Sequence, residues 1–532
     1  MEHAIRRHVE SRPAYLSRRK TLAWGMLLAL GIAGALTALL VGCGSVSSSA
    51  SDPATPPPTA SPLGISDVQN IVQAAAQAAD SATMVIAVAD RGGNVLAVFR
   101  KSGAGATATG NFSATENVND LAVGLARTAA YFSNDQAPLS SRTVRFISGI
   151  HFPPGVTNTA NAALYGIENT NRGCTLSTNY LPGQAVQPSL ALGGGPGLGI
   201  ITGKADLQDS DPNAVNPGGV PIFRGGVVVG GVGVAGVPAD VAEYAAYVAA
   251  TSNGFGPTPA PPGVVFVNGI ALPFVNQTTT PAGVNPGTFT GTFLVGPVAS
   301  TGQPPEGDLV APAAGPVGGL SASDVQGILN NAEATANQTR AVIRLPLGSR
   351  TQMVIAVADL DGTIIGLRRM TDSTVFSIDV AATKARNMVY FNSASRTAAD
   401  LNQVPMGTAV TNRTIGFGAQ PIFPPGIDGT AAGPFFNLYA QDVANPCTQG
   451  FQSGPPNSNK SGIVFFPGSV GLYRNGVLVG GLGVSGDGVD QDDYVAAGGA
   501  AGFEAPTQIR ADQIVIDGVR LPYQKFPENP TE

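Results

Sequence analysis

The sequence predicts an α+β fold: two tandem copies of a small domain, each with an antiparallel sheet of two hairpins covered by helices. The first observation is a glycine-rich stretch that occurs twice, at Ile222 to Gly236 (IFRGGVVVGGVGVAG) and at Leu472 to Gly486 (LYRNGVLVGGLGVSG). Its Gly225-Gly226 and Asn475-Gly476 pairs are hairpin signals, because both central positions of a type I′ turn need a positive φ. The second observation is that segments with helical spacing of apolar residues alternate with the hairpins. Hairpins make antiparallel pairs, so one antiparallel sheet with helices packed on it is the simplest arrangement.

The first copy, residues 64–275, shows the expected elements in turn. Ser66-Asp67 caps a helix whose apolar positions follow helical spacing. Two strands and two further helices are expected at Met84 to Asp90, Val95 to Arg100, about Asp120 to Phe132 and about Ala239 to Ala250. The glycines inside the glycine-rich hairpin predict close packing of a strand on a helix, a bulge, or the close approach of another backbone or a ligand.

The second copy, residues 320–526, repeats these marks in the same order. Met353 to Asp359 reads MVIAVAD and is identical to Met84 to Asp90. The other matching marks are Ser323 to Gln326, Ala385-Arg386, Arg413-Thr414 and Phe423 to Gly426. The Thr/Pro/Gly-rich stretch between the copies, residues 276–319, has no strong periodicity and is predicted to be a linker. The chain is therefore a tandem duplication, and we expect its copies to pack on each other as an intrachain domain pair.

The N-terminus has the layout of an export signal. Basic residues precede an apolar run from Leu22 to Gly42, and Leu40 to Cys43 (LVGC) resembles the lipobox of bacterial lipoproteins. That resemblance implies removal of residues 1–42, lipidation of Cys43 and attachment to a bacterial membrane, with Gly44 favouring the outer membrane. The apolar run is also long enough to span a membrane uncleaved. Residues 43–63 are rich in Ser, Pro, Ala and Thr and predict a flexible tether.

The composition excludes several functions. Charged residues make up 12% of the chain and the formal net charge is −6, with no basic patch, which argues against nucleic-acid binding. Without residues 1–42, His151 is the only histidine, so a zinc site with two histidines is excluded and a serine triad would need His151. Gly193 to Gly197 is not followed by Lys-Ser/Thr, so it is no phosphate loop. No catalytic set emerges.

The repeated motifs resemble those of the GlcG/HbpS heme-binding domain family. They are MVIAVAD with a turn glycine after it, the Ala-Arg helix, and the V-G-G-[VL]-G-V-[AS]-G hairpin, and they occur in both copies. The resemblance implies a small α/β domain on an antiparallel sheet, assembly into dimers or larger homo-oligomers, and binding of heme or a related tetrapyrrole. It also implies a histidine axial ligand, which the second copy lacks.

Three side chains are candidate iron ligands. His151 precedes Phe152 to Gly155 in a loop where aromatic and proline residues could pack against a flat apolar ligand. The alternative is a surface or hydrogen-bonded loop histidine, since the aligned residue of the second copy is Ile422. Tyr131 and Tyr390 are duplicated and could ligate iron as tyrosinate, or could pack their rings in the core.

Duplicated arginines are candidates for recognising carboxylates, such as heme propionates, in a bidentate manner. They form three pairs: Arg127 with Arg386, Arg142 with Arg413, and Arg100 with Arg369. The alternative is internal salt bridging with Asp90, Asp359 or other acids. If heme binds, we expect one per chain, with His151 on the iron and Arg127 or Arg142 at a propionate.

Export also bears on the cysteines. Once Cys43 is lipidated, Cys174 and Cys447 are the remaining thiols in an oxidising compartment, and a disulfide between the copies is expected. The alternative is that each cysteine packs inside its own copy.

The sequence as a whole predicts an exported, membrane-tethered protein that binds heme or another small molecule without catalysis. An accessory or enzymatic role in periplasmic oxidative metabolism and a structural surface protein are the alternatives.

Overall fold

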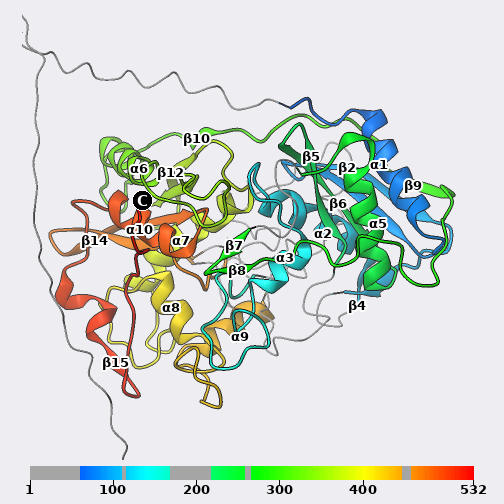
Figure 1. Cartoon of the computed structure of the whole chain (residues 1–532). Coiled ribbons are helices and arrows are strands. Elements are labelled where there is room, and N and C mark those ends of the chain that lie inside the picture. Colours follow the sequence, from blue (N-terminus) through cyan, green and yellow to red (C-terminus); the bar gives the residue numbers. More distant parts are fainter. Residues whose placement is uncertain (1–59, 111–114, 168–216, 258–264, 446–456, 460) are drawn as a thin grey trace, which may run out of the picture. The chain divides into compact units, whose positions relative to one another are not determined.

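A computed structural model describes residues 60–110, 115–167, 217–257, 265–445, 457–459 and 461–532. Within these residues it contains two five-stranded antiparallel sheets with helices packed on them (Figure 1). The α+β prediction is therefore confirmed. None of the described helices combines the length and the hydropathy that a membrane span needs.

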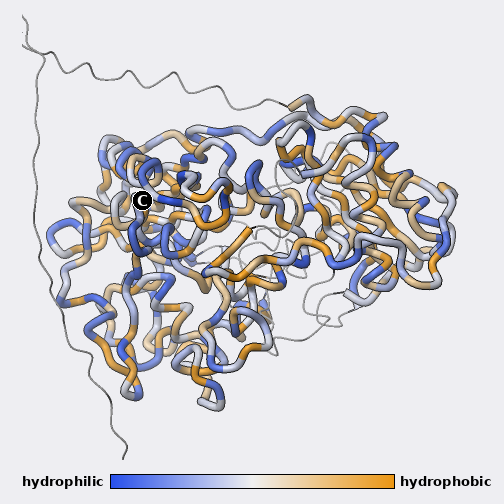
Figure 2. Tube along the Cα trace, in the orientation of Figure 1, coloured by the Kyte–Doolittle hydropathy of each residue, from blue (hydrophilic) through white to orange (hydrophobic). Residues whose placement is uncertain are grey.

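The sheet of the first copy has the strand order β5-β6-β1-β2-β9. Its strands are β1 (Val85–Asp90), β2 (Val95–Lys101), β5 (Gly219–Arg224), β6 (Val227–Ala235) and β9 (Gly291–Val295). The helices are α1 (Ile65–Ala78), α2 (Val118–Phe132), α3 (Ser141–Phe146) and α5 (Ala239–Thr251), and the short pairs are β3 (Thr107–Thr109) with β4 (Thr115–Asn117) and β7 (Phe266–Val267) with β8 (Ile270–Ala271). The strands of this sheet and the helices beside them carry mostly hydrophobic residues (Figure 2).

The sheet of the second copy has the order β10-β12-β11-β14-β13. Its strands are β10 (Gly307–Val310), β11 (Val354–Ala358), β12 (Ile364–Arg369), β13 (Ser469–Arg474) and β14 (Val477–Ser485). The helices are α6 (Ala322–Ala336), α7 (Phe376–Asn392), α8 (Asn412–Gly418), α9 (Phe436–Ala444) and α10 (Val489–Gly499), and β15 (Val515–Ile516) pairs with β16 (Val519–Arg520). Apart from the edge strand, the central order matches the first sheet, as a duplication requires.

The glycine-rich hairpins form β5-β6 and β13-β14. The turn residues have positive φ, 58° and 86° at Gly225 and Gly226 and 52° and 78° at Asn475 and Gly476, as a type I′ turn requires. Inside β6, a Cβ on Gly233 would lie 2.6 Å from the backbone nitrogen of Ala126 and still closer to the carbonyl oxygen of Ala122. The glycines therefore let the backbone of α2 lie directly on the strand, which is the strand–helix alternative named above.

The stretch predicted to be a linker also contributes to both sheets. β9 pairs with β2, with Val98 opposite Val295, and β10 pairs with β12, with Gly307 opposite Arg369. Each sheet thus has a fifth strand beyond its two hairpins. No local pattern predicts these strands, because they are edge strands whose pairing depends on a partner already in place rather than on their own alternation.

The two copies are in direct contact. The rings of Phe132, at the end of α2, and Phe376, at the start of α7, stack with their centroids 4.2 Å apart. The backbone nitrogen of Val375 donates to the carbonyl oxygen of Tyr131 over 3.1 Å. One apolar cluster contains buried residues from both copies. Tyr131, one of the candidate ligands, belongs to this cluster.

Candidate functional site

Arg127 and Arg386 hold the first hairpin of each copy against its central helix. The Nε atom of Arg127 donates to the carbonyl oxygen of Gly93 over 3.0 Å, and that of Arg386 donates to Gly362 over 2.9 Å. Both glycines have positive φ and make the turn between the paired strands. Burial lowers the pKa of each guanidinium to about 10, so both remain protonated at neutral pH. Both arginines therefore stabilise a turn from inside the protein.

Tyr131 and Tyr390 are buried, and their hydroxyls have partners within the chain. The Tyr131 hydroxyl donates to the carbonyl oxygen of Gly92 over 3.2 Å, and the Tyr390 hydroxyl donates to the carboxylate of Asp400 over 2.9 Å. Burial raises the pKa of both phenols. The tyrosinate that iron would require is therefore disfavoured at both positions.

Arg142 and Arg413 each make two ion-pair contacts with acidic residues of a neighbouring helix. The helices involved occupy equivalent places in the two copies. Arg142, on α3, contacts Glu243, on α5, at 2.6 and 3.0 Å. Arg413, on α8, contacts Asp493 at 2.5 Å and Asp490 at 2.6 Å, both on α10. Arg142 therefore binds one carboxylate in a bidentate manner, as the sequence suggests, whereas Arg413 bridges two separate carboxylates. In both cases the carboxylates belong to the protein.

The third pair, Arg100 and Arg369, binds backbone carbonyl oxygens. Arg100 donates to Ala104 at 2.9 Å and Gly105 at 2.7 Å, and Arg369 donates to Ser373 at 2.7 Å. Each arginine thereby stabilises the segment that follows its own strand.

The acids at the end of β1 and just after β11 accept hydrogen bonds near the turns. Asp90 accepts from the backbone nitrogen of Asn94 at 2.9 Å, and Asp359 accepts from that of Gly318 at 2.7 Å. Asp90 therefore stabilises its own turn, whereas Asp359 holds a backbone segment that is distant in the sequence.

His151 joins the two copies. Its Nε2 atom lies 2.6 Å from a carboxylate oxygen of Asp428, and the imidazole is buried. The backbone nitrogen of Asp428 donates in turn to the Asn158 side chain over 3.1 Å. The loop that begins at Phe152 and its counterpart that begins at Phe423 therefore meet at this contact, and the imidazole nitrogen that usually binds heme iron faces a carboxylate.

We expect His151→Ala to lower the free energy of unfolding by about 1–2 kcal/mol, because it removes a hydrogen bond between the copies that joins the buried imidazole to the partly exposed Asp428 carboxylate. Asp428→Asn should give a similar loss. Since both substitutions break one contact, their effects should not add in the double variant. Urea denaturation of the three variants measures this, and full additivity would show that the contact contributes nothing.

The Cys43, Cys174 and Cys447 predictions lie outside the described residues. Within the described residues, no group of three or more His, Cys, Asp or Glu side chains is placed to hold a metal ion. The predicted heme ligands that are described all bind groups of the protein, so they do not fit heme as free axial ligands or propionate partners. No coordination geometry for heme follows from them.

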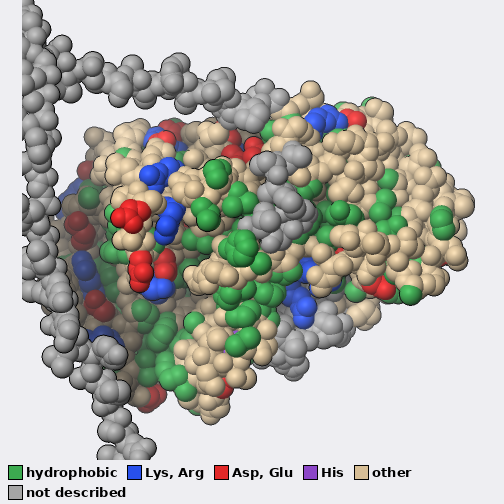
Figure 3. All heavy atoms as spheres, viewed as in Figure 1, with side chains coloured by type: hydrophobic (Ala, Val, Ile, Leu, Met, Phe, Trp, Pro, Cys, Tyr) green, Lys and Arg blue, Asp and Glu red, His purple; other side chains and the backbone are tan. Residues whose placement is uncertain are grey.

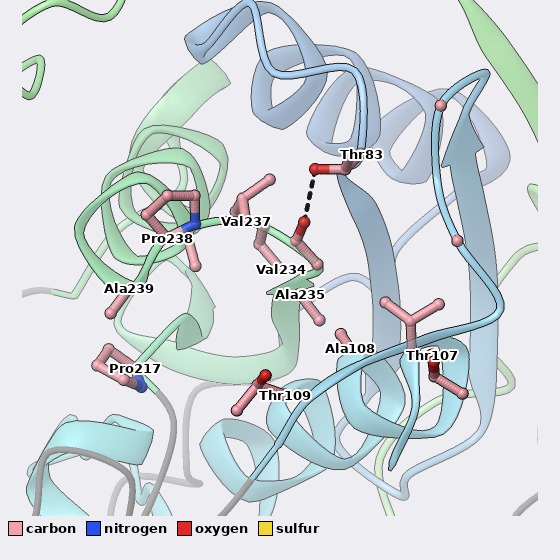
Figure 4. Close-up of a pocket in the computed structure, with 15 residues that line it drawn as sticks. Thr83, Thr107, Ala108, Thr109, Pro217, Val234, Ala235, Val237, Pro238 and Ala239 are labelled. Carbon is pink, nitrogen blue, oxygen red and sulfur yellow. Dashed lines mark hydrogen bonds between the residues drawn. The ribbon is translucent and has the colours of Figure 1, made fainter. Parts of the chain in front are cut away.

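The first copy contains a cavity of about 560 Å³ beside the ends of β1 and β6 (Figure 4). Six of the residues that line it are small or apolar: Thr83, Gly103, Val118, Ala235, Val237 and Ala242. None of its described lining residues is charged. The Thr83 hydroxyl donates to the carbonyl oxygen of Gly236 over 2.6 Å and so closes one wall of the cavity.

The corresponding place in the second copy is filled with polar side chains. The strand registers and helix starts align those six residues, in the same order, with Gln352, Asp372, Ser377, Ser485, Asp487 and Asp492. Arg344 lies among them, 2.8 Å from Asp372 and in contact with Asp487. Lys384 is 3.0 Å from Asp492, and the hydroxyls of Ser485 and Ser377 are 3.0 Å apart.

Arg344 comes from a segment that is longer in the second copy. Residues 337–353 connect α6 to β11, whereas residues 79–84 connect α1 to β1. The segment is also tied to the first copy, because Gln136 accepts from Arg344 at 3.1 Å and donates to the carbonyl oxygen of Leu345 at 2.6 Å. Arg344 could not be found from the duplicated residues, because it has no counterpart in the first copy. The longer spacing from Ser323 to Met353 than from Ser66 to Met84 was the available signal.

The same network contains a pair of aspartates from different copies. The backbone nitrogen of Asp135 donates to the Asp372 carboxylate over 3.0 Å, and Arg91 lies 3.0 Å from Asp135 and 2.7 Å from Asp372. Burial and the neighbouring Asp372 charge raise the pKa of Asp135 to about 6, although Arg91 opposes the shift.

This shift predicts a pH dependence of stability. The folded protein holds the Asp135 proton at pH values where the unfolded chain has released it, so this group stabilises the fold at about pH 4 and loses that contribution as the pH rises through about 6. We therefore expect the stability difference between Asp135→Asn and wild type to shift in favour of the variant from pH 4 to pH 7. Urea midpoints across this range, with exposed Glu528→Gln as the control, measure it. A difference that is constant with pH would contradict the assignment.

Comparisons with known proteins give one family match and similarity to solved structures. Residues 320–501 match the family model described as "Haem degrading protein HbpS-like". Two solved structures are similar. A crystal structure of a PduOC:heme complex is 25% identical, with 35% of this chain and 97% of that chain covered and a TM-score of 0.23. The Klebsiella pneumoniae protein ORFY is 17% identical, with 38% and 95% covered and a TM-score of 0.23. No curated protein matches the chain.

The fold thus defines a tandem α+β protein with a cavity in its first copy and a filled counterpart in its second. Residues 320–501, in the second copy, match the HbpS-like family model. The family resemblance predicted from the sequence is confirmed there.

Proposed function

We propose that this chain is an exported, lipid-anchored protein that binds heme or another small molecule without converting it. The match of residues 320–501 to the HbpS-like family carries the heme proposal. The Leu40 to Cys43 motif and the tether after it support export and a lipid anchor. The family description also names heme degradation, so turnover is the alternative that a heme experiment has to separate from binding.

Titration of the mature protein with hemin tests the heme proposal. We expect a shifted Soret band that saturates and stays constant with time when ascorbate is added. His151→Ala should leave the band position unchanged, because Asp428 already occupies the histidine Nε2. A spectrum identical to free hemin would refute heme binding, and steady bleaching with ascorbate would show degradation instead.

Export has its own test. Globomycin treatment should block removal of residues 1–42, and Cys43→Ser should abolish lipid attachment. A Cys43→Ser protein that is still processed and still fractionates with the membrane would refute the lipid anchor.

A second candidate ligand, an uncharged small molecule, is favoured by the cavity in the first copy. Its volume of about 560 Å³ lies within the range of about 300–1,000 Å³ that is typical of small-molecule sites. Threonine hydroxyls and aliphatic groups line it, which is the combination of apolar wall and few polar anchors that such sites use.

A further inference from the structure

We infer that, of the two copies, only the first binds a ligand in the cavity beside β1 and β6, because the second copy fills the corresponding position with its own Arg344. We also infer that this ligand is uncharged. This inference deepens the proposed binding function: it names the copy and the chemical class of the ligand.

In the second copy, the side chain that fills this position and residues that surround it carry opposite charges. There the occupant is a guanidinium, and the walls supply the carboxylates of Asp487 and Asp372. Arg344 and Asp487 are almost completely buried, so the charges are matched where water does not reach them. The position has therefore been built around a cation that is part of the chain.

In the first copy, neutral residues replace those charged residues. Val237 stands where the second copy has Asp487, and Gly103 stands where it has Asp372. Ala242 replaces Asp492, and Leu125 of α2 replaces Lys384 of α7. Because every charge of the network has been removed together, a charged ligand would lose its hydration without finding a counter-charge among the described lining residues.

The described part of the first copy has no counterpart of Arg344. The connection over residues 79–84 is short, and its Thr83 hydroxyl is bonded to the carbonyl oxygen of Gly236 at the wall. On the face shown in Figure 3, charged side chains likewise gather over the second copy, where α6 and α10 lie, and are sparse over the first.

A matched series of probes tests this inference on the mature full-length chain. Benzyl alcohol, benzoate and benzylammonium differ mainly in charge, and saturation-transfer NMR with isothermal titration gives their affinities. We expect benzyl alcohol to bind at least about tenfold more tightly than either ion. Ala235→Phe, which fills the cavity, should lose at least about tenfold in affinity. Ala334→Phe, beside a shallower depression of about 330 Å³ in the second copy, is the control and should bind as wild type does.

Val237→Asp gives a second readout that does not depend on a filled cavity. Val237 is only partly buried, and an aspartate there restores one carboxylate of the second copy's arrangement. We expect it to shift the preference from benzyl alcohol to benzylammonium. Equal affinity of wild type for the neutral and charged probes, or binding that neither variant changes, would overturn the inference. Hemin binding together with benzyl alcohol binding that Ala235→Phe does not weaken would leave the proposed function standing and this inference refuted, whereas no binding of hemin or benzyl alcohol would refute both.

Discussion

Arg344→Met is expected to lower the free energy of unfolding by about 3–5 kcal/mol, because it leaves a buried carboxylate without its cation. Asp487 is completely buried and pairs with Arg344, and Asp372 loses one of its two arginine partners. Methionine has a similar length, so the loss would reflect the charge more than the volume. Urea denaturation of the full chain, followed by far-UV circular dichroism, measures it.

A control on the same segment separates the network from the segment itself. Arg350 is exposed, and its guanidinium donates to the carbonyl oxygen of Gln338 over 3.1 Å. Arg350→Met should therefore change stability by no more than about 0.5 kcal/mol. Combining Arg344→Met with Asp487→Asn should recover part of the loss, because the uncompensated charge is then gone. Equal, small effects of Arg344→Met and Arg350→Met would show that the buried network does not stabilise this copy.

The elements that the sequence predicted correctly are those whose signal is local. The Gly225-Gly226 and Asn475-Gly476 pairs specify their turns through positive φ alone, and the strands beside them carry the branched residues that suit a sheet. α2 and α5 begin and end within a few residues of the predicted bounds. Duplication strengthened each of these predictions, because every element was seen twice.

The edge strands β9 and β10 could not be predicted in this way. They lie in a Thr/Pro/Gly-rich stretch and pair with β2 and β12, which stand far away in the sequence. Tertiary pairing, rather than local propensity, decides such strands.

In the candidate site, too, tertiary contacts decide what the sequence alone could not predict. The sequence identified the duplicated arginines correctly as unusual, but their partners decide what they do. Arg142 meets Glu243 and Arg413 meets Asp493 only after folding. The cavity was missed for a different reason: it is defined by small neutral residues such as Gly103 and Val237, which have no motif. It becomes visible as a site only when the filled counterpart in the second copy is placed beside it.

A second large effect on stability is expected when a glycine of β6 is substituted. We expect Gly233→Val to lower the free energy of unfolding by about 3 kcal/mol or more. A Cβ there would lie 2.6 Å from the backbone nitrogen of Ala126, so the rigid backbone of α2 would have to move away from the sheet. The same helix carries Arg127 and ends at Phe132, which stacks on Phe376 of the second copy. Displacement of α2 would therefore weaken both the first hairpin and the contact between copies.

Gly483→Val in β14 should have a comparable effect, because a Cβ there would lie 2.5 Å from the backbone nitrogen of Ala385 in α7. Gly327, on α6, is the matched control, since a Cβ at that position meets nothing within 4 Å. Gly327→Ala should be neutral or should stabilise the protein by up to about 1 kcal/mol, as expected for a glycine in a helix interior. Urea denaturation of the three variants measures these differences. A Gly233→Val protein within about 1 kcal/mol of wild type would show that α2 can shift without loss, and that close strand–helix packing does not explain the glycines that both copies share.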